Sequence, residues 1–284
     1  MNLISVQIYT DQNTPWDRTK IDFPIDLNTK WPGNGCGLCN QLFKIINSLC
    51  YIDSNQHNIY FDLLSKDYNS GETMTTSTIL DLEEMRNKYN YKIYDILDFD
   101  YKKNEYHIHN DFYVFRAYQQ NLDLFTSNLN RIIFKKELED LSLKIINKKG
   151  LNSEIVNLTH IRIDTDFKNH MYGTSGEQSY LDLIENYRIE INKNCDKSIP
   201  LVLLLEETNH DFVNELRKDY DVVTFEKSDV TNINADINGR EVFALIDLLI
   251  GKNLKVNTFV GTEKSSFSIV LNQLKRYKNS IMIK

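Results

Sequence analysis

The sequence predicts an α/β fold with mostly parallel sheets. From residue 154 onwards, short apolar segments alternate with amphipathic ones, which is the pattern of βαβ units. Pro200–Leu205 is a continuous apolar run, as expected of a parallel strand covered on both faces. The 284 residues are enough for one large domain or two small ones.

The C-terminal half can be assigned element by element. Hydrophobic patterning predicts strands over Glu154–Ile161, Pro200–Leu205, Val222–Phe225, Val256–Val260 and Ser280–Ile283. It predicts helices over Gly176–Lys193, Asn209–Lys218, Gly239–Ile250 and Ser265–Leu274. Asn209 is a suitable N-cap for the second helix, and the third is expected to stop near Gly251.

The N-terminal half is less regular. We expect strands over Ile4–Tyr9, Ile59–Leu63 and Phe112–Phe115, helices over Gln41–Ile52 and Lys135–Ile146, and loops over 10–34 and Asp67–Thr78. Asn147–Asn152 has the composition of a linker. The predicted domains are therefore 1–150 and 151–284.

Composition restricts the classes of function. The net charge is −7 and no long basic run is present, which argues against binding to duplex nucleic acid. No segment approaches the roughly 18 consecutive apolar residues of a membrane span, and the first residues do not resemble a secretory signal. Four cysteines are too few for a disulfide scaffold. We therefore expect a cytoplasmic protein; the oligomeric state stays open.

His160 and Arg162 stand at the end of a predicted strand. Side chains alternate along a strand, so the two should project on the same side. Ligands of open α/β sheets bind outside the carboxyl ends of the strands, and an arginine fork suits a phosphate or carboxylate. The alternative is a core histidine beside a surface ion-pair arginine.

Two further segments combine glycine or serine with the start of a helix. Gly33–Phe43 places three glycines before a predicted helix, whose first N–H groups can bind an anion. Thr258–Ser268 runs from a strand through a turn to Ser265 and Ser266, which could seat a phosphate. The alternatives are an ordinary glycine loop and a pair of capping serines.

Other short motifs carry less weight. Asp164/Asp166 and Asp98/Asp100 match the Asp-x-Asp pattern of metal-dependent glycosyltransferases, although such pairs are common by chance. Cys36-x-x-Cys39 has no second zinc pair and is more simply a coincidence within the glycine loop. The glycosylation sequon at Asn157 lies inside a predicted buried strand, so we discount it.

Three of these segments together resemble the fucosyltransferase superfamily that contains α1,2- and α1,6-fucosyltransferases and protein O-fucosyltransferases. The matching segments are Gly35–Gln41, the His160-x-Arg162 motif and Ser265-Ser266-Phe267, in the family's order. The resemblance implies a GT-B-like fold of two Rossmann-like domains with a cleft between them. The N-terminal domain would be on the acceptor side and the C-terminal domain would bind the nucleotide sugar.

The resemblance also implies an activity, which is metal-independent, inverting transfer of fucose from GDP-fucose to a glycan or protein hydroxyl, with no cofactor. Arg162 and Asn40 would be the catalytic residues, and Arg162 would stabilise the departing β-phosphate. The remaining donor-binding residues would be His160, Gly37, Leu38, Cys39, Asp247, Ser265, Ser266 and Phe267, with Asp247 a candidate for guanine. A base is hard to assign; Asp166, Glu206 and Glu207 are the candidates.

The chain departs from the family pattern at two positions. Cys39 replaces the usual glycine, and Ile163 stands where α1,2-type enzymes have a second arginine. These departures keep two alternatives open besides the metal-dependent transferase: a non-catalytic nucleotide-sugar-binding protein and a transferase that uses another nucleotide sugar.

Overall fold

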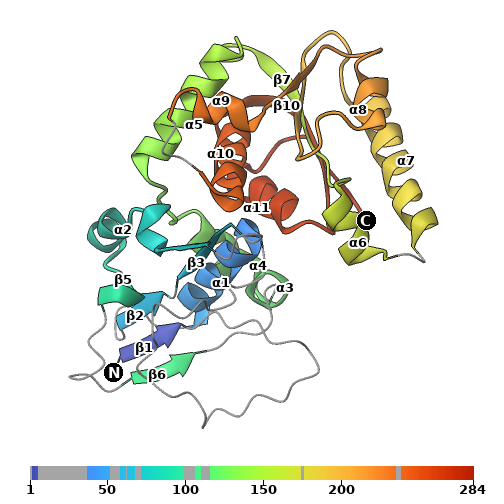
Figure 1. Ribbon diagram of the computed structural model, residues 1–284. Coiled ribbons are helices and arrows are strands. Elements are labelled where there is room, and N and C mark those ends of the chain that lie inside the picture. The colour runs from blue at the N-terminus through green and yellow to red at the C-terminus, as the bar shows by residue number, and fades with distance from the viewer. Residues whose placement is uncertain are drawn as a thin grey trace. The chain divides into compact units, whose positions relative to one another are not determined.

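The computed structural model describes residues 2–5, 37–51, 58–61, 63–67, 72–98, 106–109, 116–173, 176–234 and 238–284 (Figure 1). The chain divides into two compact units. Unit 1 contains residues 1–138 and 238–244, and unit 2 contains 139–237 and 245–284. The division at residue 150 expected from the sequence stays a prediction. No helix of the described residues is long and apolar enough to span a membrane.

Unit 2 is built on a parallel five-stranded sheet in the order β11-β10-β7-β8-β9. The strands are β7 (Ile155–His160), β8 (Leu201–Leu204), β9 (Val222–Thr224), β10 (Lys255–Thr262) and β11 (Ser280–Ile283). From β7 the chain builds outward through β8 and β9, then returns to place β10 on the other side of β7. The direction of building reverses between β7 and β10, which is where doubly wound sheets bind ligands.

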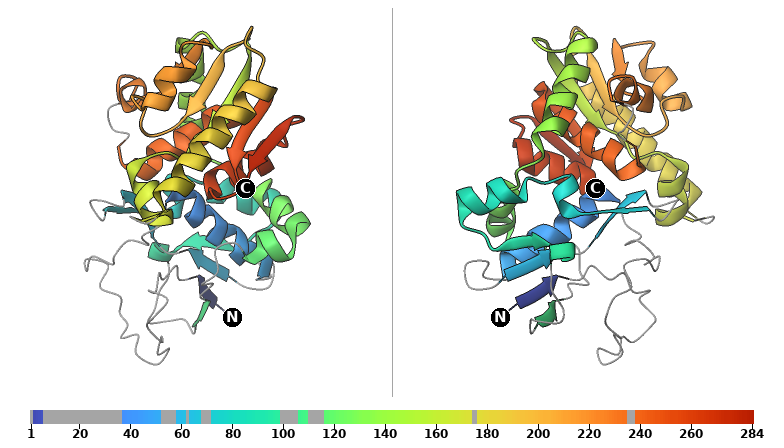
Figure 2. Two further views of the ribbon diagram at one scale, coloured as in Figure 1. Left: turned by 90° about the vertical axis from the view of Figure 1, so that its right-hand side faces the viewer. Right: turned by 60° about the vertical axis from the view of Figure 1, so that its left-hand side comes forward.

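Helices cover both faces of this sheet (Figures 1 and 2). They are α5 (Lys136–Lys148), α6 (Thr165–Met171), α7 (Glu177–Asn194), α8 (Asp211–Leu216), α9 (Lys227–Thr231), α10 (Arg240–Asn253) and α11 (Ser266–Lys275). The side chains of β8 alternate between the two layers. Leu201 and Leu203 join the core beneath α7 and α8, whereas Leu204 packs toward Gly251 of α10.

Unit 1 has a parallel four-stranded sheet in the order β5-β2-β1-β6. Its strands are β1 (Asn2–Ser5), β2 (Asn58–Phe61), β5 (Ile93–Asp95) and β6 (Tyr106–His109), and a separate antiparallel pair is formed by β3 (Leu64–Asp67) and β4 (Glu72–Met74). The helices are α1 (Leu38–Tyr51), α2 (Leu82–Tyr89), α3 (Arg116–Gln120) and α4 (Leu122–Leu129), with 3-10 turns at Thr76–Thr78 and Ile96–Asp98. Both parallel sheets thus have the α/β character predicted from the sequence.

The structure corrects or refines three local predictions. The N-cap of α8 is His210 rather than Asn209, because the His210 ring accepts the N–H of Phe212. Helix α10 does stop near Gly251, at Asn253, but the glycine lies within the helix and is not its cap. A Cβ at Gly251 would approach Leu271 and Leu204, so this glycine serves close packing rather than a helix terminus.

The predicted loop Asp67–Thr78 contains the strand β4 and a 3-10 turn, so this part of the prediction was wrong. Residues 63–67 and 72–78 are rich in polar side chains, and the β3–β4 pair has irregular register, which weakens the period-two pattern of the sequence. The predicted strand Phe112–Phe115 and the Cys36 position lie outside the described residues.

Candidate functional site

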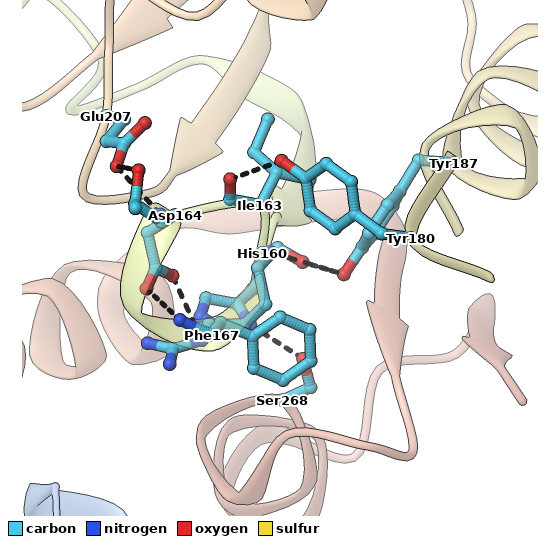
Figure 3. Close-up of polar contacts among 10 residues, drawn as sticks. His160, Ile163, Asp164, Phe167, Tyr180, Tyr187, Glu207 and Ser268 are labelled. Atoms are coloured by element: carbon cyan, nitrogen blue, oxygen red, sulfur yellow. Dashed lines mark hydrogen bonds and ion pairs between the residues drawn. The ribbon is translucent and has the colours of Figure 1, made fainter. Parts of the chain in front are cut away.

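The end of β7 is fixed by two tyrosines of α7. The Tyr187 hydroxyl donates to the carbonyl of His160 at 3.0 Å, and the Tyr180 hydroxyl donates to the carbonyl of Ile163 at 2.7 Å (Figure 3). Burial raises the pKa of both phenols, that of Tyr180 to about 12, so both hydroxyls keep their protons. The segment carrying His160 and Arg162 is therefore held at both ends, at the switch point of the sheet.

His160 is buried and contacts α11 in two ways. Its Nδ1 lies 2.7 Å from the Ser268 hydroxyl (Figure 3), and its ring stacks on Phe267 with centroids 4.3 Å apart. The Ser268 oxygen accepts the N–H of Thr262 at 3.2 Å, which leaves the hydroxyl hydrogen to be donated to Nδ1. By this assignment of hydrogens, Nε2 carries the proton of the neutral ring.

His160 is uncharged, which agrees with a single proton on Nε2. Burial, together with the nearby Arg162 charge, lowers the pKa of His160 well below its usual value. The ring is neutral at physiological pH and offers one N–H. It can donate a hydrogen bond to an anionic oxygen without adding a proton-dependent charge.

Arg162 is braced on one side only. Its Nε lies 3.3 Å from Oδ2 of Asp164, and its guanidinium carbon lies 5.0 Å from the centre of the Phe167 ring. Asp164 is itself fixed, since its Oδ1 accepts the N–H of Phe167 at 2.9 Å as the N-cap of α6. Within the part of the chain that the structure describes, the two terminal guanidinium nitrogens have no hydrogen-bond partner. That edge is the bidentate one, suited to a phosphate.

The start of α11 lies beside the same strand ends. Ser265 is the N-cap of α11, but its hydroxyl makes no capping hydrogen bond, and Ser266 begins the helix. Ser265 thus does not act as a conventional side-chain cap, so the simpler explanation of the serine pair does not hold for the residue at the cap position. Since no side-chain cap occupies them in the described part of the chain, the first N–H groups of α11 can bind an anion.

Gly261 allows this close packing of α11 on β10. A Cβ at this position would lie 2.9 Å from Cβ and Oγ of Ser268 and 2.9 Å from Phe259. Gly261→Ala is expected to lower the free energy of unfolding by about 1–3 kcal/mol, because the helix carrying Ser268 must shift. The measurement is urea denaturation. Gly37→Ala is the control, since its Cβ would meet Glu241 at an ordinary 3.6 Å; equal stability of the two variants would contradict the prediction.

Asp247 projects from α10 in unit 2. It is partly exposed, and burial together with the charge of Glu206 raises its pKa to about 7. A carboxylate that titrates near neutrality is typical of functional sites. Glu206 follows β8, so two acidic groups occupy this region of unit 2.

The other base candidates differ in what surrounds them. Glu207 accepts both the N–H and the hydroxyl of Thr165, at 2.9 and 3.0 Å (Figure 3). It is thereby committed to the start of α6. Asp166 lies in the first turn of α6, and its side chain is outside what the structure describes. Among the described residues no cluster of three potential metal ligands occurs.

The residues predicted at the glycine segment lie in unit 1. Helix α1 begins at Leu38, whose N–H donates to the Glu241 carboxylate of α10. A phosphate could bind this amide only if that carboxylate moved. Cys39 is buried and Gly37 is exposed, while the side-chain oxygen of Asn40 is buried with no hydrogen-bond partner. Unit 2 brings together His160, Arg162 and the α11 residues. The four residues of the glycine segment, 37–40, belong to unit 1.

Sequence reasoning missed the residues that hold the site. Ser268, Tyr180 and Tyr187 each bind the segment at the end of β7, and Asp164 with Phe167 orients Arg162. The spacing of Tyr180 and Tyr187, two turns apart on one helix face, was a usable signal. Ser268 gave none, because its partner His160 is 108 positions away in the sequence.

No protein-family model and no curated protein matches the chain. Among solved structures, POFUT1 in complex with GDP aligns with a TM-score of 0.56 at 9% identity, covering 87% of this chain and 95% of that chain. POFUT1 in complex with GDP-fucose gives the same values. The chain has a fucosyltransferase-like fold.

This fucosyltransferase-like fold agrees with the sequence motifs at the level of architecture. The predicted resemblance and the GT-B-like α/β fold class are confirmed, with a parallel sheet in each unit. At 9% identity the likeness concerns the fold. The roles of individual residues therefore depend on the geometry described above.

Proposed function

We propose that the protein is a glycosyltransferase that transfers fucose from GDP-fucose to a hydroxyl acceptor on a glycan or protein, with inversion and without a metal. The observation that carries the proposal is the state of Arg162. Its guanidinium is oriented by Asp164 and Phe167, and its bidentate edge, at the switch point of the sheet, has no partner in the described part of the chain. The fold likeness to POFUT1, solved with GDP and with GDP-fucose, supports the same donor.

The chemistry follows from charge. When the acceptor hydroxyl attacks the anomeric carbon, the bond from that carbon to the β-phosphate oxygen breaks and negative charge grows on GDP. Arg162 neutralises this charge, while the Nε2–H of His160 and the first turn of α11 donate to the phosphates. These groups are fixed before substrate arrives, so little reorganisation is needed during transfer.

The remaining roles belong to the same proposal. Asp247 accepts hydrogen bonds from guanine, Asn40 with the residues Gly37–Cys39 faces the donor sugar, and Asp166 is the candidate base for the acceptor hydroxyl. A metal at Asp164 is disfavoured because its two oxygens already serve the Phe167 N–H and Arg162. The partners are a nucleotide-sugar donor and a hydroxyl acceptor.

Calorimetric titration tests the donor. The full chain is titrated with GDP, GDP-fucose, GDP-mannose, UDP and dTDP, each with and without EDTA. We expect GDP and GDP-fucose to bind equally well with EDTA present. If only UDP or dTDP bound, GDP-fucose would not be the donor and another nucleotide sugar would take its place. If binding were lost with EDTA, the metal-free mechanism would be contradicted. GDP binding without transfer or hydrolysis of GDP-fucose would favour a non-catalytic nucleotide-sugar-binding protein.

A further inference from the structure

One face of α1 leads from the surface into the interior of unit 1. Gly37, Asn40 and Lys44 are spaced by three and four residues, which places them on the same side of the helix. Gly37 is exposed, Asn40 is partly exposed, and Lys44 is only 6% exposed. Side chains in a helix lean toward its N-terminus, so Lys44 extends over the turn that carries Asn40.

Each of the two polar side chains on this face has one atom without a hydrogen-bond partner among the described residues. Nζ of Lys44 and Oδ1 of Asn40 are buried and make no hydrogen bond. An unpaired buried ammonium is among the most costly groups in a protein interior, and an unpaired amide oxygen adds to that cost. A donor and an acceptor, carried by residues one helical turn apart, are therefore both left without a partner among the described residues in the first half of α1.

The kind of ligand that satisfies both atoms is narrow. A phosphate or carboxylate accepts from Lys44 but offers nothing to the oxygen of Asn40. The carboxylate of Glu241 already lies at the Leu38 N–H, and it would repel a second anion at this end of the helix. A sugar hydroxyl accepts from the ammonium and donates to the amide oxygen at the same time.

We propose that Lys44, together with Asn40, binds a ring hydroxyl of a sugar substrate and so contributes to sugar specificity. This inference rests on the proposed function, since that function supplies the sugar. Two sugars are candidates, the fucose of the donor and the sugar of a glycan acceptor. They present the same hydroxyl chemistry, and the experiment separates them.

The test compares Lys44→Met with the wild type. Calorimetry measures affinity for GDP and for GDP-fucose, and a glycan array with GDP present measures saccharide binding. We expect GDP affinity to stay within twofold. A tenfold or greater loss for GDP-fucose assigns the hydroxyl to the donor, and a tenfold or greater loss on the array assigns it to the acceptor. The melting temperature should not fall, because the variant removes an unpaired buried charge.

Three further variants keep the result interpretable. Thr76→Val removes another buried, unpartnered polar atom of unit 1 and should leave every sugar response unchanged. Asn40→Asp supplies Lys44 with an anion one turn away and should raise the melting temperature while abolishing the sugar response. Lys44→Gln replaces Lys44→Met if the latter does not fold.

The outcomes separate this inference from the proposed function. If Lys44→Met binds GDP-fucose and every saccharide as the wild type does, the role of Lys44 is overturned. The same holds if neither protein binds any saccharide and both bind GDP-fucose equally. In both cases the proposed donor site of unit 2 is unaffected. A wild-type chain that binds no GDP contradicts the proposed function itself.

Discussion

Replacing Arg162 by lysine is expected to lower kcat/KM for fucose transfer by about 10³-fold, close to the effect of alanine. The structure gives the reason. Nε of Arg162 forms an ion pair with Asp164, and the two terminal nitrogens, a planar pair, have no hydrogen-bond partner among the described residues. A lysine ammonium is a single point charge and cannot hold two phosphate oxygens in that geometry. The measurement is steady-state release of GDP from GDP-fucose with a saturating acceptor.

The control for this prediction is Arg188→Ala. Arg188 lies on α7 in the same unit, is partly exposed, and pairs with Glu185 and Glu215. Such surface pairs contribute little, so this variant should retain activity and fold normally. Arg162→Ala with turnover near that of the wild type, and with an unchanged melting temperature, would contradict the assignment of Arg162 as the phosphate ligand.

Sequence periodicity predicted the part of the site that is local. The alternation along β7 placed His160 and Arg162 at the end of a buried strand, and β7 ends at His160. The run Pro200–Leu205 predicted a strand buried on both faces, and Leu201–Leu204 is such a strand. These inferences succeeded because strand alternation and continuous burial are written in neighbouring residues.

The supporting contacts could not be predicted in the same way. The hydrogen bond between His160 and Ser268 joins the end of β7 to α11, two elements far apart in the sequence. It depends on how α11 packs at Gly261. Gly251 shows the same limit, since a glycine near a helix end suggests a cap, whereas this one lies within the helix in close packing. Tertiary contact, not local propensity, determines these positions.

The affinity for GDP is expected to rise with pH through about pH 7, by up to tenfold per unit on the acidic side, because of Asp247. Burial and the charge of Glu206 raise the pKa of Asp247 to about 7. Guanine presents two N–H donors, so it requires the ionised carboxylate, and below the pKa each unit of pH lowers the ionised fraction tenfold. The measurement is calorimetry of GDP binding between pH 5 and pH 8. The terminal phosphate of GDP also titrates in this range, so the same series with Asp247→Asn gives the pH dependence that is due to the phosphate alone.

The same carboxyl group makes an independent prediction for stability. The folded-state pKa of Asp247 is raised above its unfolded value of 3.8, so between about pH 4 and pH 7 the folded chain holds a proton that the unfolded chain has released. This group therefore lowers the free energy of unfolding as pH rises through that window, by at most about 1.4 kcal/mol per unit. Asp247→Asn should remove this contribution. Glu206→Gln should lower the folded-state pKa of Asp247, because it removes a nearby negative charge, and the pH window should then end at a lower pH. A GDP affinity that depends on pH equally in wild type and Asp247→Asn would show that Asp247 does not contact guanine. If the two proteins then differed only in the pH dependence of stability, Asp247 would be a structural acid with no role in binding.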